Sequence, residues 1–466
     1  MIASNPTVAH SRETSNPRLF IDCTHTWHSR SNTGIQRVVR NLATYARGTV
    51  AGVVCQPVIW AGVGFVPIGA VGTQPSLVYR TYRFGERAAG VARRVLPGGV
   101  SSEEPKRLER SSFSPLAPGR VPLSPLGALA RQMAGVASAP RTLALGRKIS
   151  FRPGDRLLLA DAHWHHPQSW GGVERAQEQG AKITPLFYDL IPVRLPETFE
   201  AGVVASFRRW LAWVLPLADD ALAISQATAD DVHAFLAENP ALRETPLPST
   251  HYRLGADLDG RAEAEPSREI TDRIADHAAR KEPLFLMVAT LEPRKNHGDL
   301  LTAIDRHWQR GGAGTLILAG RVGWLSGEII ERIEAHPERG RRLIHRSDLT
   351  DADLEALYSA ATATICPSAL EGFGLPIVEA QSRGSLVVAS DIPVHREVGG
   401  ETCRYFPLGD ATALAEIIQT LAGGERCSPP TDYRWPNWEE STIELVERLS
   451  RLDAAPIAPS TRSSVR

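Results

Sequence analysis

The stretch that decides the fold class runs from residue 363 to residue 380 and is ATICPSALEGFGLPIVEA. An apolar run at 363–366 predicts a buried strand, and Pro376 opens a helix after a turn that contains two glycines. Such a strand, turn and helix point backbone N–H groups and a helix N-terminus at an anion. Glu371 and Glu379 are eight residues apart, one in the turn and one in the helix, which is too far for an acid/base pair. We therefore expect them to bind two different parts of one extended ligand.

Length and charge set the broad class of the protein. At 466 residues the chain is too long for one core, so two or three domains are expected. The net charge is zero, which argues against nucleic acid as a partner. The segment from Arg80 to Arg152 has 14 basic and 4 acidic residues, a net charge of about +10. A solvated loop carries such charge, and so does a segment that binds an anionic membrane surface or a lipid-phosphate substrate.

Cysteine usage and hydropathy predict a cytoplasmic protein. The five cysteines are scattered without a C-x-x-C pair, and Cys55 and Cys366 lie in apolar runs. This pattern predicts buried thiols in a reducing compartment. The N-terminal residues are polar and no run reaches 18 apolar residues, so we expect neither secretion nor a membrane span.

Strands and helices alternate in two parts of the chain. Strands expected at 18–24 and 53–60 flank a helical stretch that begins near Gly34, which is the beginning of a βαβ unit. From residue 283 onward the same alternation predicts a second α/β domain with a parallel sheet. The predicted organisation is a disordered leader (1–17), a first domain (18–265) with a basic Pro-, Ser- and Ala-rich insert (84–151), a second domain (266–426), a final helix (427–452) and a disordered tail (453–466).

The start of the final helix has a capping signature. Asn437 is a good N-cap, and Glu440 stands at the third helical position, where it can complete a capping box. Trp438, Leu445 and Leu449 share one face of this helix, which we expect to pack against the rest of the protein.

Several motifs resemble one enzyme family. Residues 371–379, EGFGLPIVE, look like the E-x7-E signature of the retaining glycosyltransferases of family 4. Residues 289–297 (ATLEPRKNH) are similar to that family's phosphate-binding segment, and residues 390–397 (SDIPVHRE) to a later strand end. Residues 33–37, 225–228 and 254–257 also match in the first domain. The resemblance, to bacterial mannosyl- and rhamnosyl-type enzymes, implies the α/β GT-B fold: two Rossmann-like domains that face a cleft, with a C-terminal helix that crosses back to the first domain.

The resemblance implies metal-independent transfer from a nucleoside-diphosphate sugar. Arg294, Lys295 and Glu371 would be catalytic, the first two because fixed cations stabilise the leaving diphosphate. Glu371 would face the sugar ring, and Glu379 would accept hydrogen bonds from the ribose hydroxyls. The remaining donor-binding positions are the backbone N–H groups of Gly372, Phe373, Gly374 and Leu375, and Gly34, which would let the first domain approach the diphosphate. Taken singly, such residues are also typical of solvated loops and helix starts.

The acceptor side departs from the family pattern. Many relatives have a histidine where this chain has Tyr188, so that role is not carried over, whereas Asp189 matches. His163 at a neighbouring strand end is the candidate imidazole. Together with His165 and His166 it suggests a metal site, but no carboxylate–histidine spacing supports one. We expect no metal and no cofactor, and retention by front-face attack assisted by the leaving phosphate.

The predicted function is transfer of a hexose to a glycan or lipid-linked acceptor in cell-surface polysaccharide biosynthesis. The donor is expected to be a GDP-sugar rather than a UDP-sugar, with mannose, rhamnose or a related hexose. The basic insert would allow peripheral attachment to an anionic inner membrane. A sugar-nucleotide epimerase of similar fold and a catalytically decayed nucleotide-sugar-binding protein are the alternatives.

Overall fold

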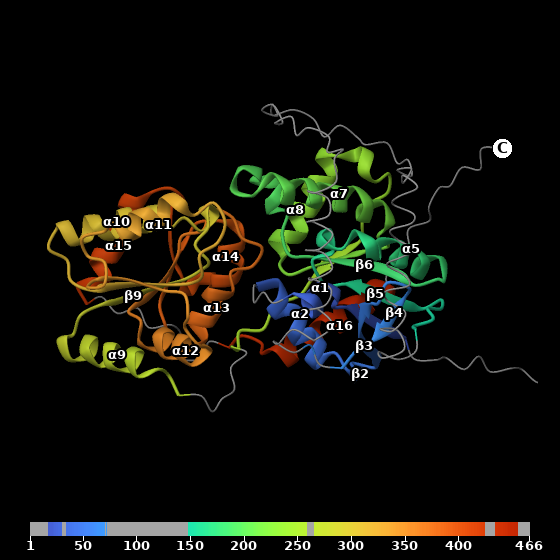
Figure 1. Ribbon diagram of the computed structural model, residues 1–466, viewed down its shortest axis with the longest axis horizontal. Helices are drawn as coiled ribbons and strands as arrows, with labels where there is room; N and C mark the ends of the chain where they lie inside the picture. The colour runs from blue at the N-terminus through green and yellow to red at the C-terminus, as the bar shows by residue number, and fades with distance from the viewer. Residues whose placement is uncertain are drawn as a thin grey trace, which may run out of the picture.

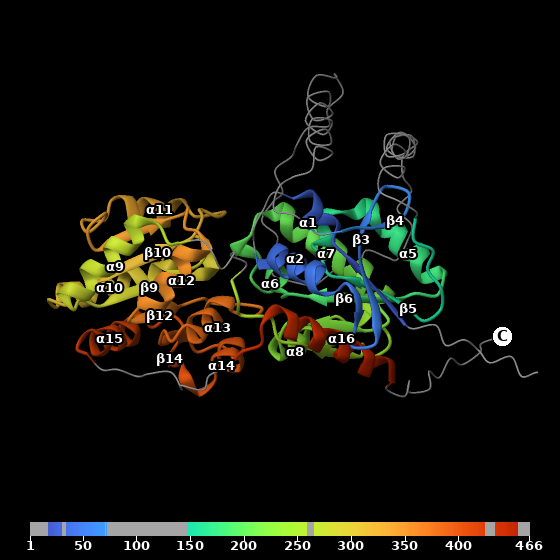
Figure 2. The same ribbon diagram turned by 90° about the horizontal axis from the view of Figure 1, so that it is seen from below.

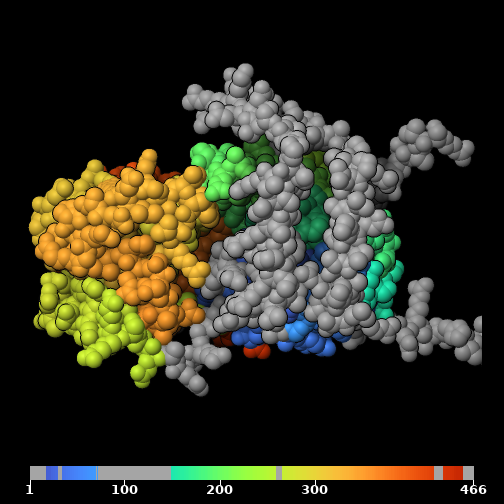
Figure 3. All heavy atoms as spheres, in the orientation of Figure 1, coloured from blue at the N-terminus to red at the C-terminus, as the bar shows by residue number. Residues whose placement is uncertain are grey.

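The computed structural model describes residues 17–29, 34–69, 71, 148–258, 265–424 and 434–454. These residues form two α/β domains that lie side by side (Figures 1 and 3). The predicted leader, basic insert and tail lie outside the described residues, apart from residues 17, 148–151 and 453–454. None of the helices in the described ranges is long and apolar enough to cross a bilayer.

The first domain is built on an eight-stranded sheet. Its strands are β1 (Arg18–Asp22), β2 (Gly48–Val50), β3 (Val53–Trp60), β4 (Phe65–Pro67), β5 (Asp155–Leu159), β6 (Lys182–Phe187), β7 (Ala221–Ala223) and β8 (Ser249–His251). The order is β2-β3-β1-β5-β6-β7-β8, with β4 paired to β3. Only the β2–β3 and β3–β4 pairs are antiparallel. The sequence did not predict β2, whose hairpin to β3 turns at Ala51 and Gly52 with φ of 46° and 81°, as a tight hairpin turn requires.

Alternation along β1 divides the first domain into two cores. Leu19 and Ile21 belong to the core that includes α2 (Gly34–Tyr45) and α16 (Trp438–Ala454). Phe20 belongs to the core on the other face, with α5 (Trp170–Glu178) and α7 (Ala201–Leu217). The described residues of this domain also form α1 (Thr24–His28), α6 (Ile191–Arg194) and α8 (Gln226–Glu238).

The second domain has a parallel sheet, as predicted, and six strands form it. Its strands are β9 (Leu284–Val288), β10 (Thr315–Ala319), β11 (Leu343–Arg346), β12 (Ala363–Cys366), β13 (Val387–Ser390) and β14 (Arg404–Phe406), in the order β11-β10-β9-β12-β13-β14. Its helices are α9 (Arg268–Arg280), α10 (His297–Gln309), α11 (Gly327–Glu334), α12 (Asp351–Ala360), α13 (Leu375–Ser382), α14 (Pro393–Gly399) and α15 (Ala411–Ala422). The strand order reverses between β9 and β12, and ligands of open α/β sheets bind at the strand carboxyl ends beside such a point.

The last helix returns to the first domain, which confirms the predicted crossover. Glu440 N donates to Asn437 Oδ1 at 2.8 Å and Asn437 N donates to Glu440 Oε2 at 3.1 Å, so the predicted capping box is also confirmed. From there α16 packs against α2 and β8, and Figure 2 shows this helix lying along the first domain. Trp438, Leu445 and Leu449 are all at most 3% exposed on this face.

Candidate active site

The turn between β12 and α13 is held in place by both domains. Gly374 precedes α13 with a φ of 98°, a left-handed conformation that favours glycine. Gly372 packs so tightly against the first domain that an added Cβ would lie 1.7 Å from the Tyr188 carbonyl oxygen. The Gly372 carbonyl accepts hydrogen bonds from two first-domain hydroxyls, Ser225 Oγ at 2.7 Å and Thr228 Oγ1 at 3.1 Å. The turn therefore bridges the two domains.

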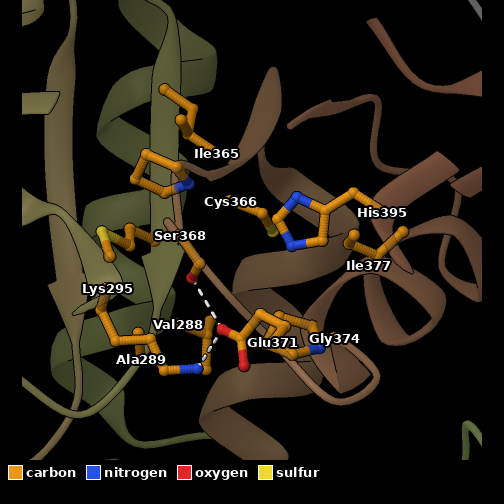
Figure 4. Close-up of a pocket in the computed structure, with 13 residues that line it drawn as sticks. Val288, Ala289, Lys295, Ile365, Cys366, Ser368, Glu371, Gly374, Ile377 and His395 are labelled. Carbon is orange, nitrogen blue, oxygen red and sulfur yellow. Dashed lines mark hydrogen bonds and ion pairs between the residues drawn. The ribbon is translucent and has the colours of Figure 1, made fainter. Parts of the chain in front are cut away.

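Two cations from the loop after β9 bind the carboxylate of Glu371. Arg294 Nη1 lies 2.8 Å from Oε2, and Lys295 Nζ pairs with Oε1. Ser368 Oγ donates to the same Oε1 at 2.7 Å, and Figure 4 shows Lys295 and Ser368 both pointing at it. Burial alone would raise the pKa of Glu371, but the charges of Lys295 and Arg294 outweigh it and hold that pKa far below its usual range. The carboxylate is therefore ionised at neutral pH.

Neighbouring parallel strands bring these groups together. β9 pairs with β12, so the loops that follow both strands emerge at the same edge of the sheet. Ala369 N donates to the Arg294 carbonyl at 2.8 Å and ties the two loops to each other. The predicted cations and the predicted sugar-facing glutamate thus meet at the point where the strand order reverses.

Two further carboxyls surround the cations. Arg294 Nη2 lies 2.6 Å from Glu292 Oε1, and burial raises the pKa of Glu292 although Arg294 opposes the shift. Asp189, in the first domain, interacts electrostatically with Arg294. Burial raises the pKa of Asp189, although the charge of Arg294 opposes the shift. Glu292 was not among the predicted site residues, although it stands in the predicted phosphate-binding segment, two residues before Arg294. Because carboxylates hold the Arg294 fork on two sides, its orientation is fixed.

The second glutamate of the motif lies in a separate contact between the domains. Glu379 on α13 is 3% exposed, and Tyr358 on α12 donates its hydroxyl to Oε2 at 2.8 Å. Arg37 on α2 pairs with the other oxygen, Oε1. Arg37 lies in the first-domain motif at residues 33–37, but no role was predicted for it. Its partner lies 342 residues away, so only the tertiary structure reveals the pair.

A small cavity lies between the two loops beside Glu371. It measures about 10 Å³, close to what one water needs, and Figure 4 shows its lining, which includes Lys295, Gly374 and His395. His395 Nδ1 lies 3.0 Å from the Ser390 carbonyl, which can only accept, so Nδ1 is the donor. Burial lowers the pKa of His395, and its neutral Nε2 is then an acceptor at the cavity.

The predicted acceptor-side residues are mostly buried. Tyr188 is 6% exposed, and its hydroxyl donates to the Ala160 carbonyl at 2.7 Å. His163 is 2% exposed, with Nε2 3.1 Å from Asp22 Oδ2. Gly34, which was predicted to bind the donor, is exposed at the start of α2, and an added Cβ would meet no atom within 4 Å. Of these residues, the structure brings only the 188–189 segment into contact with the glycine turn.

Histidines gather near the carboxyl ends of β1 and β5. His25 Nδ1 lies 3.0 Å from His166 Nε2, and the rings of His25 and His165 stack at 5.1 Å. Burial lowers the pKa of His25 and of His165 to about 4 and that of His166 to about 2, so these imidazoles are neutral at neutral pH. In the part of the chain that the structure describes, no three such side chains are arranged to hold a metal ion.

Two more contacts join the domains near the site. Both carboxylate oxygens of Glu397 on α14 accept from the N-terminus of α8, at 2.7 Å from Gln226 N and 2.8 Å from Ala227 N. Trp324 Nε1 donates to the Thr198 carbonyl at 2.7 Å. The domains therefore touch at these places as well as at the glycine turn.

Comparison with known proteins supports the sequence-based resemblance. Residues 269–427 match the model of the family "Glycosyl transferases group 1". The serotype-specific mannosyltransferase WbdA of Escherichia coli is 31% identical over 311 residues, which cover 65% of this chain and 38% of that protein. The O-antigen chain mannosyltransferase B of Escherichia coli is 32% identical over 174 residues, 35% of this chain and 45% of that protein. This chain therefore spans less than half the length of these curated relatives.

A solved structure supports the fold over nearly the whole chain. The crystal structure of Anabaena Alr3699/HepE in complex with UDP and glucose superposes with a TM-score of 0.54 and 15% identity. The match covers 94% of this chain and 98% of that one. It confirms the predicted GT-B architecture of two Rossmann-like domains.

Proposed function

We propose that the chain, whose residues 269–427 match the glycosyl transferase group 1 family, is a retaining hexosyltransferase. In this proposal it moves a hexose, mannose by analogy with its relatives, from a nucleoside-diphosphate sugar to a glycan or lipid-linked acceptor. A GDP-sugar is the proposed donor. The proposed setting is assembly of a cell-surface polysaccharide such as an O-antigen at the inner face of the membrane.

The observation that supports this proposal is the pairing of Arg294 and Lys295 with Glu371, at the point where the strand order reverses. When the bond between the sugar C1 and the phosphate oxygen breaks, negative charge develops on the leaving diphosphate. Two cations fixed at the strand ends are suited to stabilise that charge without a metal ion. The Glu371 carboxylate that now holds them has the same kind of oxygen acceptors that a phosphate offers.

The other donor contacts follow from the motif. Glu371 would bind the sugar hydroxyls, and Glu379, on the neighbouring helix, the ribose. The backbone N–H groups of residues 372–375 lie between the two glutamates, beside the N-terminus of α13. The acceptor hydroxyl would attack from the face that the diphosphate leaves, and its proton would pass to a diphosphate oxygen. Asp189, which approaches the same cluster from the first domain, is the proposed acceptor-side residue.

Nucleoside-diphosphate release tests the proposal. The purified chain is incubated with GDP- and UDP-hexoses and with mannosyl oligosaccharide or lipid-phosphate acceptors. We expect release with a mannose donor, and we expect Lys295→Ala to lower it at least about a hundredfold, the usual effect of removing one transition-state donor. Lys182→Ala is the matched control, because that lysine is 41% exposed and pairs with Asp453 on α16. Absence of release with every donor and acceptor would favour a nucleotide-sugar-binding protein without activity.

A further inference from the structure

The guanidinium of Arg37 is fixed at the junction of the two domains. It pairs with Glu379 of the second domain, and its Nη2 donates to the Asp257 carbonyl at 2.5 Å. It also lies over the ring of Trp438, 5.7 Å from the ring centre. Asp257 follows the last strand of the first domain, β8. Trp438 is the first residue of α16, the helix that packs against the first domain. Asp257 and Trp438 thus hold the guanidinium on the first domain's side, and Glu379 is the partner that it reaches across the junction.

The carboxylate of Glu379 is held from both sides. Arg37 binds Oε1, and the buried Tyr358 hydroxyl donates to Oε2 at 2.8 Å. A carboxylate offers about four lone-pair positions, so each oxygen that holds one donor can accept one more. A glutamate side chain has three rotatable bonds, and its carboxylate binds two hydroxyls at once only when its plane is fixed.

We propose that Arg37 is a positioning residue of the donor site, which orients Glu379 for the two ribose hydroxyls and thereby sets discrimination against 2′-deoxyribonucleotides. This inference rests on the proposed function, in which Glu379 binds the ribose. The motifs assign recognition of the nucleoside to the second domain alone. With Arg37, a residue of the first domain also takes part in it. Ribose recognition is then complete only when the domains are closed.

The test compares the affinity for a nucleoside diphosphate with that for its 2′-deoxy form. Dissociation constants for GDP, 2′-deoxy-GDP, UDP and 2′-deoxy-UDP are measured by calorimetry with the wild-type chain. For the nucleotide that binds, we expect the deoxy form to bind about tenfold or more weakly, because a buried acceptor is then left unpaired. In Arg37→Gln the ratio should fall to about twofold, and Arg37→Lys should recover part of it.

Arg253→Gln is the matched control. Arg253 is also a first-domain arginine, pairs with Glu444 at 3.0 Å and lies 5.9 Å from the ring centre of Trp435, but it does not contact Glu379. This control loses the same charge and the same kinds of contact, so we expect it to keep the wild-type ratio.

The other outcomes distinguish failure of the role proposed for Arg37 from failure of the role proposed for Glu379. If Glu379→Gln loses the discrimination and Arg37→Gln keeps it, the proposed ribose role stands and the positioning role of Arg37 is refuted. Tighter nucleotide binding by Arg37→Gln with an unchanged ratio also refutes it, since Arg37 would then only cover the carboxylate. If Glu379→Gln keeps the full ratio, or the wild type binds neither nucleotide, the proposed donor site is wrong and the inference fails with it.

Discussion

Substitution of Gly372 by alanine should separate the glycine turn from the first domain. The new Cβ would lie 1.7 Å from the Tyr188 carbonyl oxygen, 2.9 Å from its carbonyl carbon and 3.2 Å from Asp189 Cβ. The closest of these atoms belong to the backbone and cannot rotate away. Since real Cβ contacts essentially never fall below 3.0 Å, the turn and the 188–189 segment must move apart by more than 1 Å.

The magnitude follows from the hydrogen bonds that this movement breaks. The Gly372 carbonyl accepts from Ser225 at 2.7 Å and from Thr228 at 3.1 Å, and both bonds cross the domain boundary. At about 1 kcal/mol net for each bond, closure of the domains loses about 2 kcal/mol. This loss corresponds to about a thirtyfold smaller ratio of closed to open protein. We expect turnover to fall by up to this factor, because the donor cations and Asp189 come together only in the closed arrangement.

Nucleoside-diphosphate release and small-angle scattering measure the two effects. The Gly372→Ala variant should release product more slowly, by up to about thirtyfold, and have a larger radius of gyration, while the second domain keeps its own core. Gly202→Ala on α7 is the control, because an added Cβ there meets no atom within 4 Å and alanine favours a helix. Wild-type turnover in Gly372→Ala would refute the idea that this contact completes the site.

Three further predictions concern single interactions. Glu397→Gln should weaken the charge-assisted contact with the N-terminus of α8 and lower turnover about fivefold, as product release would show, without a change in melting temperature above about 2 °C. Asn437→Ala should lower the free energy of unfolding by about 1 kcal/mol through loss of the α16 cap, whereas Asn437→Asp should keep most of it in urea titrations. Glu371→Gln should be less stable than the wild type at pH 7 by about 3 kcal/mol. Because the folded pKa of Glu371 lies below its ordinary 4.5, this stabilising effect is present above about pH 4.5 and is lost as the pH falls further. Urea titrations at pH 7 and pH 3 measure the difference, and an equal difference at both values would contradict the assignment.

The sequence by itself was enough for the features that depend on short stretches of chain. The strand at 363–366, the glycine turn and the helix after it were predicted from apolar runs, glycine and proline, and the structure has β12 and α13 there. The capping box of α16 was predicted because its two partners are three residues apart. The alternation of predicted strands and helices indicated the fold class, because such alternating elements fold into parallel sheets. The roles of Arg294, Lys295, Glu371 and Glu379 were likewise inferred from the motifs and stay predictions.

Only the tertiary structure decided which groups meet across the domains. Arg37 and Glu379 are 342 residues apart, and nothing in either local sequence specifies the other. The need for glycine at 372 comes from the Tyr188 carbonyl rather than from the turn itself, where Gly374 has the left-handed φ. Periodicity and turn chemistry report the conformation of neighbouring residues, whereas these contacts depend on how two separately folded cores are placed against each other.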